Sequence, residues 1–191
     1  TPRFNFMISL IRTLTKGVAT LYAFGAALCM GLVFLIIFVN SVQRYAFGGS
    51  FEWGEELPVY LAVYGVMFGM AWAYMLDRHV AFDLLANLLP KRVHEAFNAL
   101  VDLLMVAVGV LLGYSGYLFM MKRGKVDASS LISSARALRD ATGIDSLAVL
   151  GQMYPYYFAM VLGGGMLALA ALLRFANRIL RQDKHIAEGA F

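Results

Sequence analysis

Four stretches of the 191-residue chain contain no Asp, Glu, Lys or Arg, and this pattern constrains the fold more than any other feature. They cover residues 17–43, 57–76, 103–121 and 146–173. At ~1.5 Å rise per residue, a helix of about 19 residues, the length of the shortest stretch, crosses a hydrocarbon core of ~30 Å. Composition agrees, since 61% of the residues are hydrophobic and 15% are charged, whereas soluble domains are about half apolar and about a quarter charged. We therefore predict an all-α membrane protein whose four transmembrane helices form one domain over 1–191.

The distribution of Lys and Arg predicts the orientation of these spans. Ten of the sixteen lie on the side of the two termini and the second loop, and six lie on the other side. The N- and C-termini are therefore predicted to be cytoplasmic. The net charge of +4 requires no nucleic-acid partner, because basic residues next to a span face anionic membrane lipid.

The second loop contains a short amphipathic segment over residues 79–89. Leucines recur at one-turn spacing there, with polar residues on the other side, and Pro90 ends the pattern. This segment is too short to cross, so we predict a helix in the cytoplasmic interface, which either shields nearby lipid or grips a neighbouring subunit. His79 and Asp83 lie one turn apart in it, but two ligands without a third do not define a metal site.

The loop over residues 122–145 is long and is predicted to contain a second short helix. Ser129 or Ser130 can cap its N-terminus and Gly143 can end it. Arg136 and Arg139 then lie on its wet face. They are either ordinary surface residues or docking residues for a soluble periplasmic partner.

The segment "FEWGEELPVYL" places three carboxylates at the start of the second span. The free N–H groups and positive dipole end of a helix favour Glu52, Glu55 and Glu56 there, and Trp53 is typical of the aromatic belt at a membrane surface. Arg44 ends the preceding span. We expect Glu55 or Glu56 to pair with Arg44 or with a basic residue of another subunit.

Residues for catalysis, metal or cofactor binding are few. The histidines, His79, His94 and His185, all lie outside the spans, so no pair inside the bilayer could ligate a haem, and Cys29 has no partner. Asp102 is the only acid near a span interior, where it could pair with a basic residue or a partner chain. We expect no enzyme activity, no metal and no cofactor. The absence of these residues argues against two alternatives. A quinone or cytochrome b type membrane anchor needs histidines in the spans or paired cysteines. A small autonomous proton-coupled exporter needs an acid well inside a span.

Small residues recur at four-residue spacing in two spans. Gly65, Gly69 and Ala73 share one stripe, and Gly109 and Gly113 share another. Such stripes let helix backbones approach closely in lipid. They serve packing within the bundle, a surface for a larger membrane partner, or both.

Four motifs at fixed spacing carry a family resemblance. "NSVQRYAF" (40–47), "WGEELPVYL" (53–61), Gly69 and "HVAFDLLANLLP" (79–90) resemble, in order and spacing, the small membrane subunit of tripartite ATP-independent periplasmic (TRAP) transporters, the DctQ-like family. The similarity runs over nearly the whole chain.

The resemblance implies a multi-pass protein of the bacterial inner membrane that forms a heterodimer with a large M-type permease subunit. A soluble P-type binding protein would deliver an organic acid in the periplasm, and the large subunit would hold the substrate and sodium sites while the small subunit acts as a fixed scaffold. The sequence does not name the substrate. Our candidates for the subunit interface are Arg44, Trp53, Glu55, Glu56, Gly65, Gly69, His79, Asp83 and Asp102, and our candidates for docking of the binding protein are Arg136 and Arg139.

Overall fold

The computed structural model describes residues 2–76 and 91–188, with side chains described for 9–76, 93 and 96–179. The elements are α1 (Pro2–Phe47), α2 (Trp53–Met75), α4 (Lys91–Arg123), α5 (Leu131–Thr142), the 3-10 helix η1 (Asp145–Gly151) and α6 (Tyr154–Glu188). The predicted helix over 79–89, with His79 and Asp83, lies outside the described residues.

Four of the described helices are long and apolar enough to cross a membrane. Their candidate spans are Ser9–Phe47, Trp53–Met75, Ala96–Arg123 and Tyr154–Ile179. No strand occurs in the part of the chain that the structure describes. The prediction of an all-α, four-span membrane protein is confirmed.

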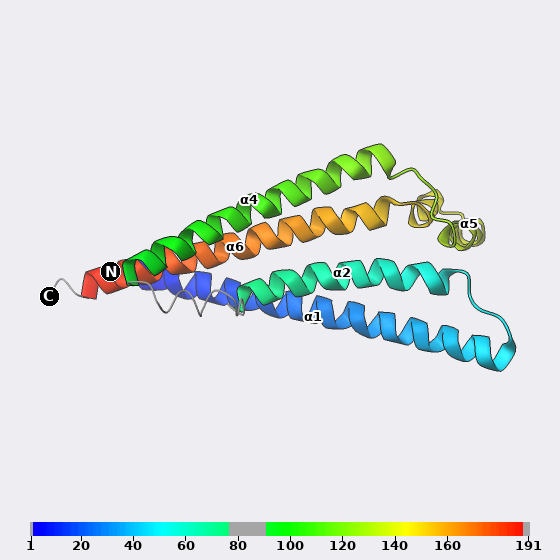
Figure 1. Cartoon of the computed structure of the whole chain (residues 1–191), viewed down its shortest axis with the longest axis horizontal. Coiled ribbons are helices and arrows are strands. Elements are labelled where there is room, and N and C mark those ends of the chain that lie inside the picture. Colours follow the sequence, from blue (N-terminus) through cyan, green and yellow to red (C-terminus); the bar gives the residue numbers. More distant parts are fainter. Residues whose placement is uncertain (1, 77–90, 189–191) are drawn as a thin grey trace.

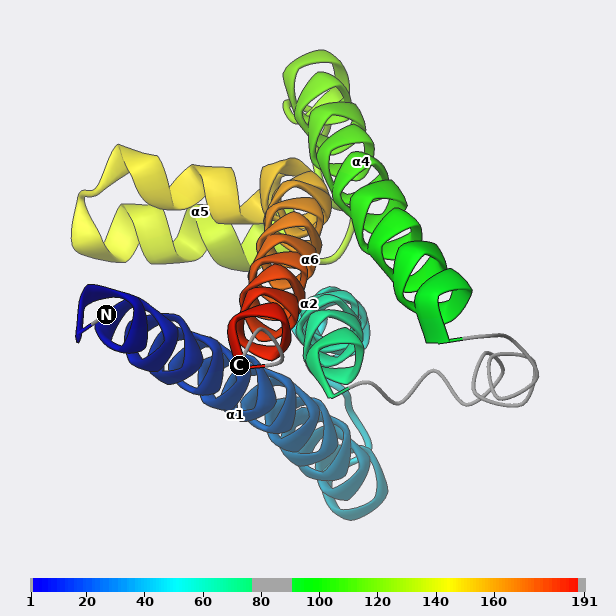
Figure 2. The same cartoon turned by 90° about the vertical axis from the view of Figure 1, so that its left-hand side faces the viewer.

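The helices form two antiparallel pairs, α1 with α2 and α4 with α6, which diverge along the bundle (Figure 1). The start of α1, the start of α4 and the end of α6 lie together, and we call this the terminal end. The opposite end, where α5 and η1 lie, is the α5 end. Viewed along the bundle, α6 occupies the centre, and α5 lies crosswise to it (Figure 2).

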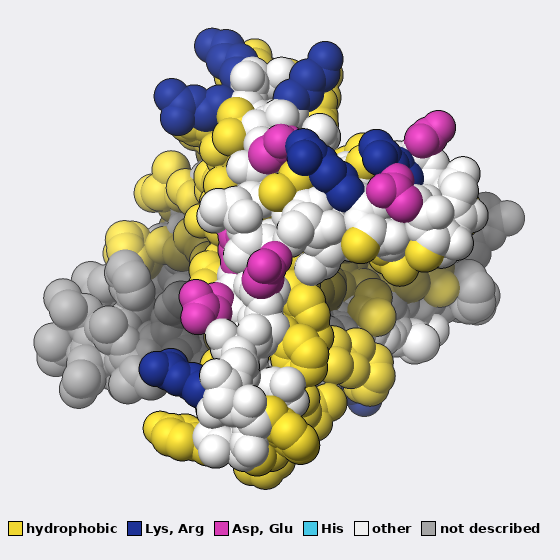
Figure 3. Space-filling model, turned by 90° about the vertical axis from the view of Figure 1, so that its right-hand side faces the viewer, with side chains coloured by type: hydrophobic (Ala, Val, Ile, Leu, Met, Phe, Trp, Pro, Cys, Tyr) yellow, Lys and Arg dark blue, Asp and Glu magenta, His cyan; other side chains and the backbone are white. Residues whose placement is uncertain are grey.

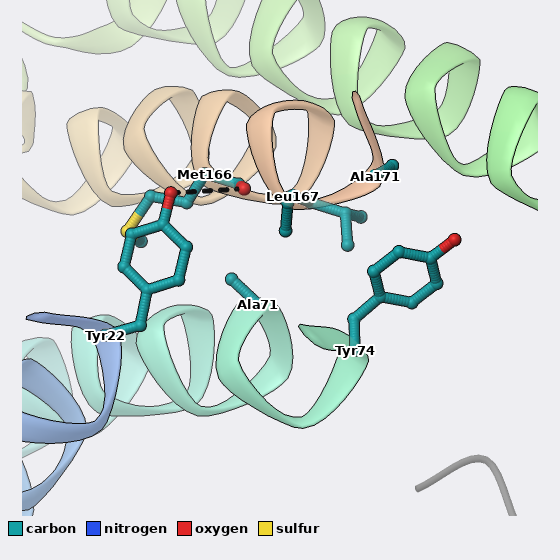
Figure 4. Packing of buried hydrophobic residues seen from close by; sticks show 7 residues of the cluster. Tyr22, Ala71, Tyr74, Met166, Leu167 and Ala171 are labelled. Atoms are coloured by element: carbon teal, nitrogen blue, oxygen red, sulfur yellow. Dashed lines mark hydrogen bonds between the residues drawn. The ribbon is translucent and has the colours of Figure 1, made fainter. Parts of the chain in front are cut away.

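The core lies where α6 packs against α1 and α2 (Figure 4). Ala71 of α2 and Ala171 of α6 are fully buried members of this core cluster. Tyr22 of α1 reaches across, and its hydroxyl donates a hydrogen bond of 3.3 Å to the backbone oxygen of Met166. The core is therefore narrow and ties three helices together through one stripe of α6.

Glycines bring α4 and α6 into backbone contact. A Cβ added at Gly109 would lie 2.6 Å from the Ala168 amide nitrogen, and one at Gly116 would lie 2.8 Å from the Met160 Cβ. Gly164 approaches the backbone of Gly113 equally closely. In lipid, the hydrophobic effect does not drive helices together, and van der Waals contact between closely packed backbones stabilises their association instead. The α4–α6 pair is therefore stabilised by close backbone packing.

The connection between α1 and α2 is short because a polar side chain holds it. Gly48 ends α1 with a φ of 74°, a left-handed conformation that suits glycine. The Phe51 N–H then donates a hydrogen bond of 2.9 Å to the Asn40 Oδ1. Gly54 completes the turn, since a Cβ there would lie 2.6 Å from the Asn40 side chain.

Helix α6 begins later than the apolar stretch that predicts it. The residues from Asp145 to Gly151 form η1, and the α-helix starts at Tyr154. Pro155 explains the start, because proline lacks an N–H and is tolerated in the first turn. At the other end α6 continues past Leu173 to Glu188, and Arg174 and Arg178, the first charged residues beyond the apolar stretch, are paired inside the protein, as described next.

Candidate functional site

A buried ion cluster joins α2, α4 and α6 near the terminal end. Its centre is Asp102, which has no solvent-accessible surface. The Arg178 Nε lies 3.1 Å from one carboxylate oxygen and the Arg174 Nε lies 3.4 Å from the other. The Tyr74 hydroxyl donates a hydrogen bond of 2.6 Å to the same oxygen that faces Arg174. One carboxylate therefore pairs with two arginines, offsets one of their two positive charges, and fixes the register of three helices.

Arginine 174 also holds the end of α2. Its guanidinium lies 4.8 Å from the centroid of the Tyr74 ring, and its Nη1 donates a hydrogen bond of 3.0 Å to the Tyr74 carbonyl oxygen. A planar cation that stacks on an aromatic ring and bonds a carbonyl at once is a role that lysine fills poorly. One turn further, the Asn177 Nδ2 donates a 2.7 Å hydrogen bond to the Thr15 Oγ1 of α1.

Sequence reasoning singled out Asp102 but not its partners. The carboxylate pairs within its own chain, and its full burial leaves no surface to offer a partner. Arg174 and Arg178 were counted only as juxtamembrane charges that orient the protein. Their i, i+4 spacing, which puts both on one helix face, was the signal that could have identified them.

A second polar cluster, the α5 clasp, holds α5 to the start of α2. The Ser130 N–H and hydroxyl donate hydrogen bonds of 2.9 and 2.6 Å to the Glu56 Oε2. The Ser133 hydroxyl donates a 2.6 Å bond to the Glu52 Oε2. Ser130 occupies the N-cap position of α5 without a capping bond from its own side chain, and the carboxylate of Glu56 accepts the N–H of this N-cap residue, as the acid of a capping box does.

The α5 clasp explains two of the three carboxylates in "EWGEEL" without a basic partner. Glu55 is exposed, and Trp53 stacks on Phe51 with ring centroids 5.2 Å apart. Arg44 is also exposed, and among the described residues no ion pair joins it to Glu55 or Glu56. The structure therefore leaves Arg44 and Glu55 facing outward as surface charges of the α5 end.

The two arginines of α5 are paired locally. Arg136 lies 3.2 Å from the Asp127 carboxylate and Arg139 lies 2.8 Å from that of Asp140. All four side chains are largely exposed. An exposed pair is worth ~0 to 1 kcal/mol, so either arginine can exchange its local acid for one on a partner at little energetic cost.

The glycine stripe of α2 divides into two parts. Gly65 packs on α1, where an added Cβ would lie 3.2 Å from the Cys29 Cβ. Gly69 has nothing within 4 Å of that position. Among the residues that the structure describes, then, the first glycine packs against another helix, and the second has an open position beside it.

Most of the apolar surface of the spans is exposed. Helix α1 is the extreme case, since 6% of its most apolar window is buried, compared with 44% for α6. Large side chains such as Phe24, Phe34 and Phe38 point away from the bundle. This surface must be covered by lipid or by another membrane helix.

Ligand chemistry is sparse in the described residues. Over residues 2–76 and 91–188, no three His, Cys, Asp or Glu side chains gather where they could hold a metal ion. The polar groups in the spans bond to one another instead, as when the Tyr64 hydroxyl donates a 2.6 Å bond to the Pro155 carbonyl oxygen. The fold and its polar clusters thus define a four-span helical membrane protein whose internal polar groups hold its helices together.

Comparison with known proteins identifies its family. Residues 33–181 match the model of the DctQ component of tripartite ATP-independent periplasmic transporters. The match covers most of the chain, which therefore belongs to the DctQ family of TRAP transporter small permeases, multi-pass proteins of the bacterial inner membrane. The family is a transporter component and not an enzyme.

Curated relatives agree over shorter stretches. The chain is 35% identical over 72 residues to the sialic acid TRAP transporter permease protein SiaT of Haemophilus influenzae, covering 38% of this chain and 12% of that protein. It is 27% identical over 86 residues to the C4-dicarboxylate TRAP transporter small permease protein DctQ of Vibrio cholerae, covering 45% and 37%. A putative TRAP transporter small permease protein of Haemophilus influenzae is 27% identical over 77 residues, covering 40% and 48%. The matched stretches thus span less than half the length of each of these relatives.

Proposed function

We propose that this chain is the fixed scaffold of a TRAP transporter, holding a large permease subunit that carries out sodium-coupled uptake of an organic acid. A soluble binding protein delivers the acid from the periplasm. The substrate class follows from the relatives, whose names specify sialic acid and C4-dicarboxylates. Both are carboxylates.

The observation that carries this proposal is the burial and bonding of Asp102, a carboxylate near a span interior. Asp102 is fully buried and bonded to Tyr74, Arg174 and Arg178 at once. A carboxylate that couples ion movement to transport must be reached by the ion and must exchange its partners. Asp102 is buried and enclosed by its three partners, which supports sites for substrate and sodium in another subunit.

The packing supports a rigid role. Backbone contact between α4 and α6 through Gly109 and Gly164 leaves no room for the two helices to slide, because interdigitated interfaces do not deform continuously. The ion cluster fixes α2 to the same pair near the terminal end. Helices α2, α4 and α6 are therefore fixed to one another in the middle of the bundle and at its terminal end. This rigidity favours a scaffold role over that of a moving element.

The exposed face of α1 supports a partner within the membrane. Lipid alone could cover Phe24, Phe34 and Phe38, but α1 packs on its bundle along one side and leaves most of its apolar surface exposed. A large permease subunit packed along α1 would hold it in place. Gly69, open within this chain, is a second position where a partner helix could approach closely.

The charge distribution supports a cytoplasmic terminal end and a periplasmic α5 end. The terminal side has ten Lys and Arg against six Asp and Glu, and the α5 side has six against six, so the whole net charge of +4 lies on the terminal side. An excess of Lys and Arg marks the cytoplasmic side. Arg136 and Arg139 would then face the periplasm, where the binding protein docks.

Reconstitution tests the division of labour. Proteoliposomes containing this chain, the large subunit or both would receive binding protein loaded with labelled sialic acid or succinate, under an inward sodium gradient. We expect uptake only with both subunits and sodium. Substrate flux through this chain alone would refute the proposal.

Cross-linking tests whether the scaffold is fixed. In a Cys29→Ser background, Phe34→Cys on α1 would be joined by a disulfide to a cysteine on the adjoining helix of the large subunit. Because the two surfaces do not move relative to each other, uptake should persist after cross-linking. Loss of uptake that reduction restores would show that this chain moves during transport.

A further inference from the structure

Helices α5 and η1 form one compact unit, the α5–η1 hairpin (residues 131–151). A Cβ added at Gly151 would lie 2.7 Å from the Ala135 Cβ and 2.9 Å from the Ile132 Cα, so the two helices are in close contact. The Ala128 N–H closes the base of the hairpin with a 2.8 Å hydrogen bond to the Gly151 carbonyl oxygen. The hairpin therefore has a defined surface of its own.

The hairpin lies at the level where two spans begin. Its N-terminal cap is bonded to Glu56, in the first turns of α2, and α6 starts three residues after Gly151. Both helices are candidate spans from these first turns onward. In end view the hairpin extends sideways from α6, across the direction of the spans (Figure 2). It thus lies beside the plane in which the hydrocarbon core ends.

Exposed aliphatic side chains occur on both arms of the hairpin. Leu138 of α5 is 47% exposed, and Val149 and Leu150 of η1 are 42% and 51% exposed. Ile144, between the two arms, is 51% exposed. Where exposed apolar side chains gather on one surface, they can mark a contact with a membrane or with another protein.

The charged side chains of the α5 end lie apart from these exposed aliphatic side chains. Seen from the α5 end, Lys, Arg, Asp and Glu side chains lie on the outward surface of the protein, and hydrophobic side chains gather along the lower border of the part that projects to the right (Figure 3). Arg136 and Arg139 are each neutralised by a neighbouring acid. The hairpin therefore offers apolar contact and little net charge.

We propose that the α5–η1 hairpin lies on the membrane surface, with Leu138, Ile144, Val149 and Leu150 inserted at the boundary of headgroups and acyl chains. An amphipathic helix that lies across the end of a span buries its apolar face in this way. In this arrangement the exposed, paired arginines Arg136 and Arg139 lie on the water side. A soluble partner is a poorer occupant of the apolar face, because such docking relies on complementary charge that this face lacks.

Fluorescence in nanodiscs tests the insertion on the full chain without any partner. In a Cys29→Ser background, Leu138→Cys and Leu150→Cys would each carry an environment-sensitive fluorophore, and Ala137→Cys would serve as the control. Ala137 is also exposed, and it lies ~100° round the helix from Leu138. Circular dichroism and gel filtration would confirm that all three variants fold.

We expect a blue-shifted emission at Leu138 and Leu150 and strong quenching by lipids that carry a nitroxide near the headgroup. Ala137 should instead be quenched by aqueous iodide. Replacing zwitterionic with anionic lipid should leave the quenching unchanged, since the hairpin charges are already paired. The proposal is overturned if Leu138 and Leu150 match Ala137, if they become shielded only when the large subunit is added, or if quenching requires anionic lipid.

Discussion

Leucine at Gly109 is expected to destabilise the bundle strongly because it adds a side chain where α4 and α6 touch through their backbones. An added Cβ already lies 2.6 Å from the Ala168 amide nitrogen and 2.8 Å from the Gly164 carbonyl oxygen. Neither atom can rotate away, so α6 itself must move. Overpacking costs ~1 to 3 kcal/mol, and a leucine against two backbone atoms belongs at the upper end of that range.

The matched control is Gly69→Leu in α2. It makes the same change within a span helix, but nothing lies within 4 Å of the added Cβ. Both variants gain the same helix propensity, up to ~1 kcal/mol relative to glycine. The difference between them therefore isolates the packing energy at Gly109, at about 3 kcal/mol.

Thermal unfolding in detergent micelles, followed by circular dichroism, measures this difference. For a chain of this size, ~3 kcal/mol corresponds to a gap of about 6 to 12 °C between the two midpoints. Gly69→Leu should melt at or above the wild-type temperature. Equal midpoints for the two leucine variants would show that α4 and α6 are free to separate, contrary to the packing described here.

Three further predictions concern the ion cluster, the α5 clasp and the open glycine. Asp102→Ala should destabilise the chain by ~3 to 5 kcal/mol, because it leaves buried arginine charge without a partner. Adding Arg178→Leu should restore part of the lost stability, and a double variant no more stable than the single one would contradict the pairing. Glu56→Gln removes the charge that caps α5, so proteolysis between residues 124 and 153 should accelerate by the equivalent of ~1 kcal/mol, whereas Glu55→Gln should have no effect; equal rates would refute the clasp. Gly69→Leu should leave the chain alone intact but reduce co-purification of the large subunit, and full retention of that subunit would place Gly69 against lipid.

The spans could be predicted because the bilayer imposes a simple rule. Each helix that crosses must be long and nearly free of charge, so the absence of charge from residue 57 to 76 was enough to locate α2. The ends of the helices follow other rules. α6 starts at Tyr154 because η1 and Pro155 intervene, and it continues beyond Leu173, where Arg174 and Arg178 pair with the buried Asp102. A count of charges along the chain registers neither effect.

The polar contacts were harder to predict because they join residues far apart in the chain. The sequence predicts that Glu55 or Glu56 pairs with Arg44 or with a basic residue of another subunit, and it gives no sign that Glu56 bonds to Ser130, 74 residues away. A carboxylate at a helix start can be satisfied by N–H and hydroxyl donors as well as by a cation. Sequence identifies the carboxylate, but only the packing of α5 on α2 selects its partner.

The same reasoning separates the small residues that the chain uses for itself from those that it leaves open. Gly109 and Gly113 in α4 meet Gly164 in α6, although the three successive glycines of α6 show no four-residue spacing of their own. Gly65 and Gly69, in contrast, share a regular stripe, and of the two Gly65 alone has a neighbour among the described residues. Periodicity shows which residues share a face, but it does not show whether that face is covered. In α2, one glycine of the stripe packs against a helix of the same chain and the next is open. We expect this arrangement in a subunit that uses the first glycine for its own bundle and the second for contact with a partner.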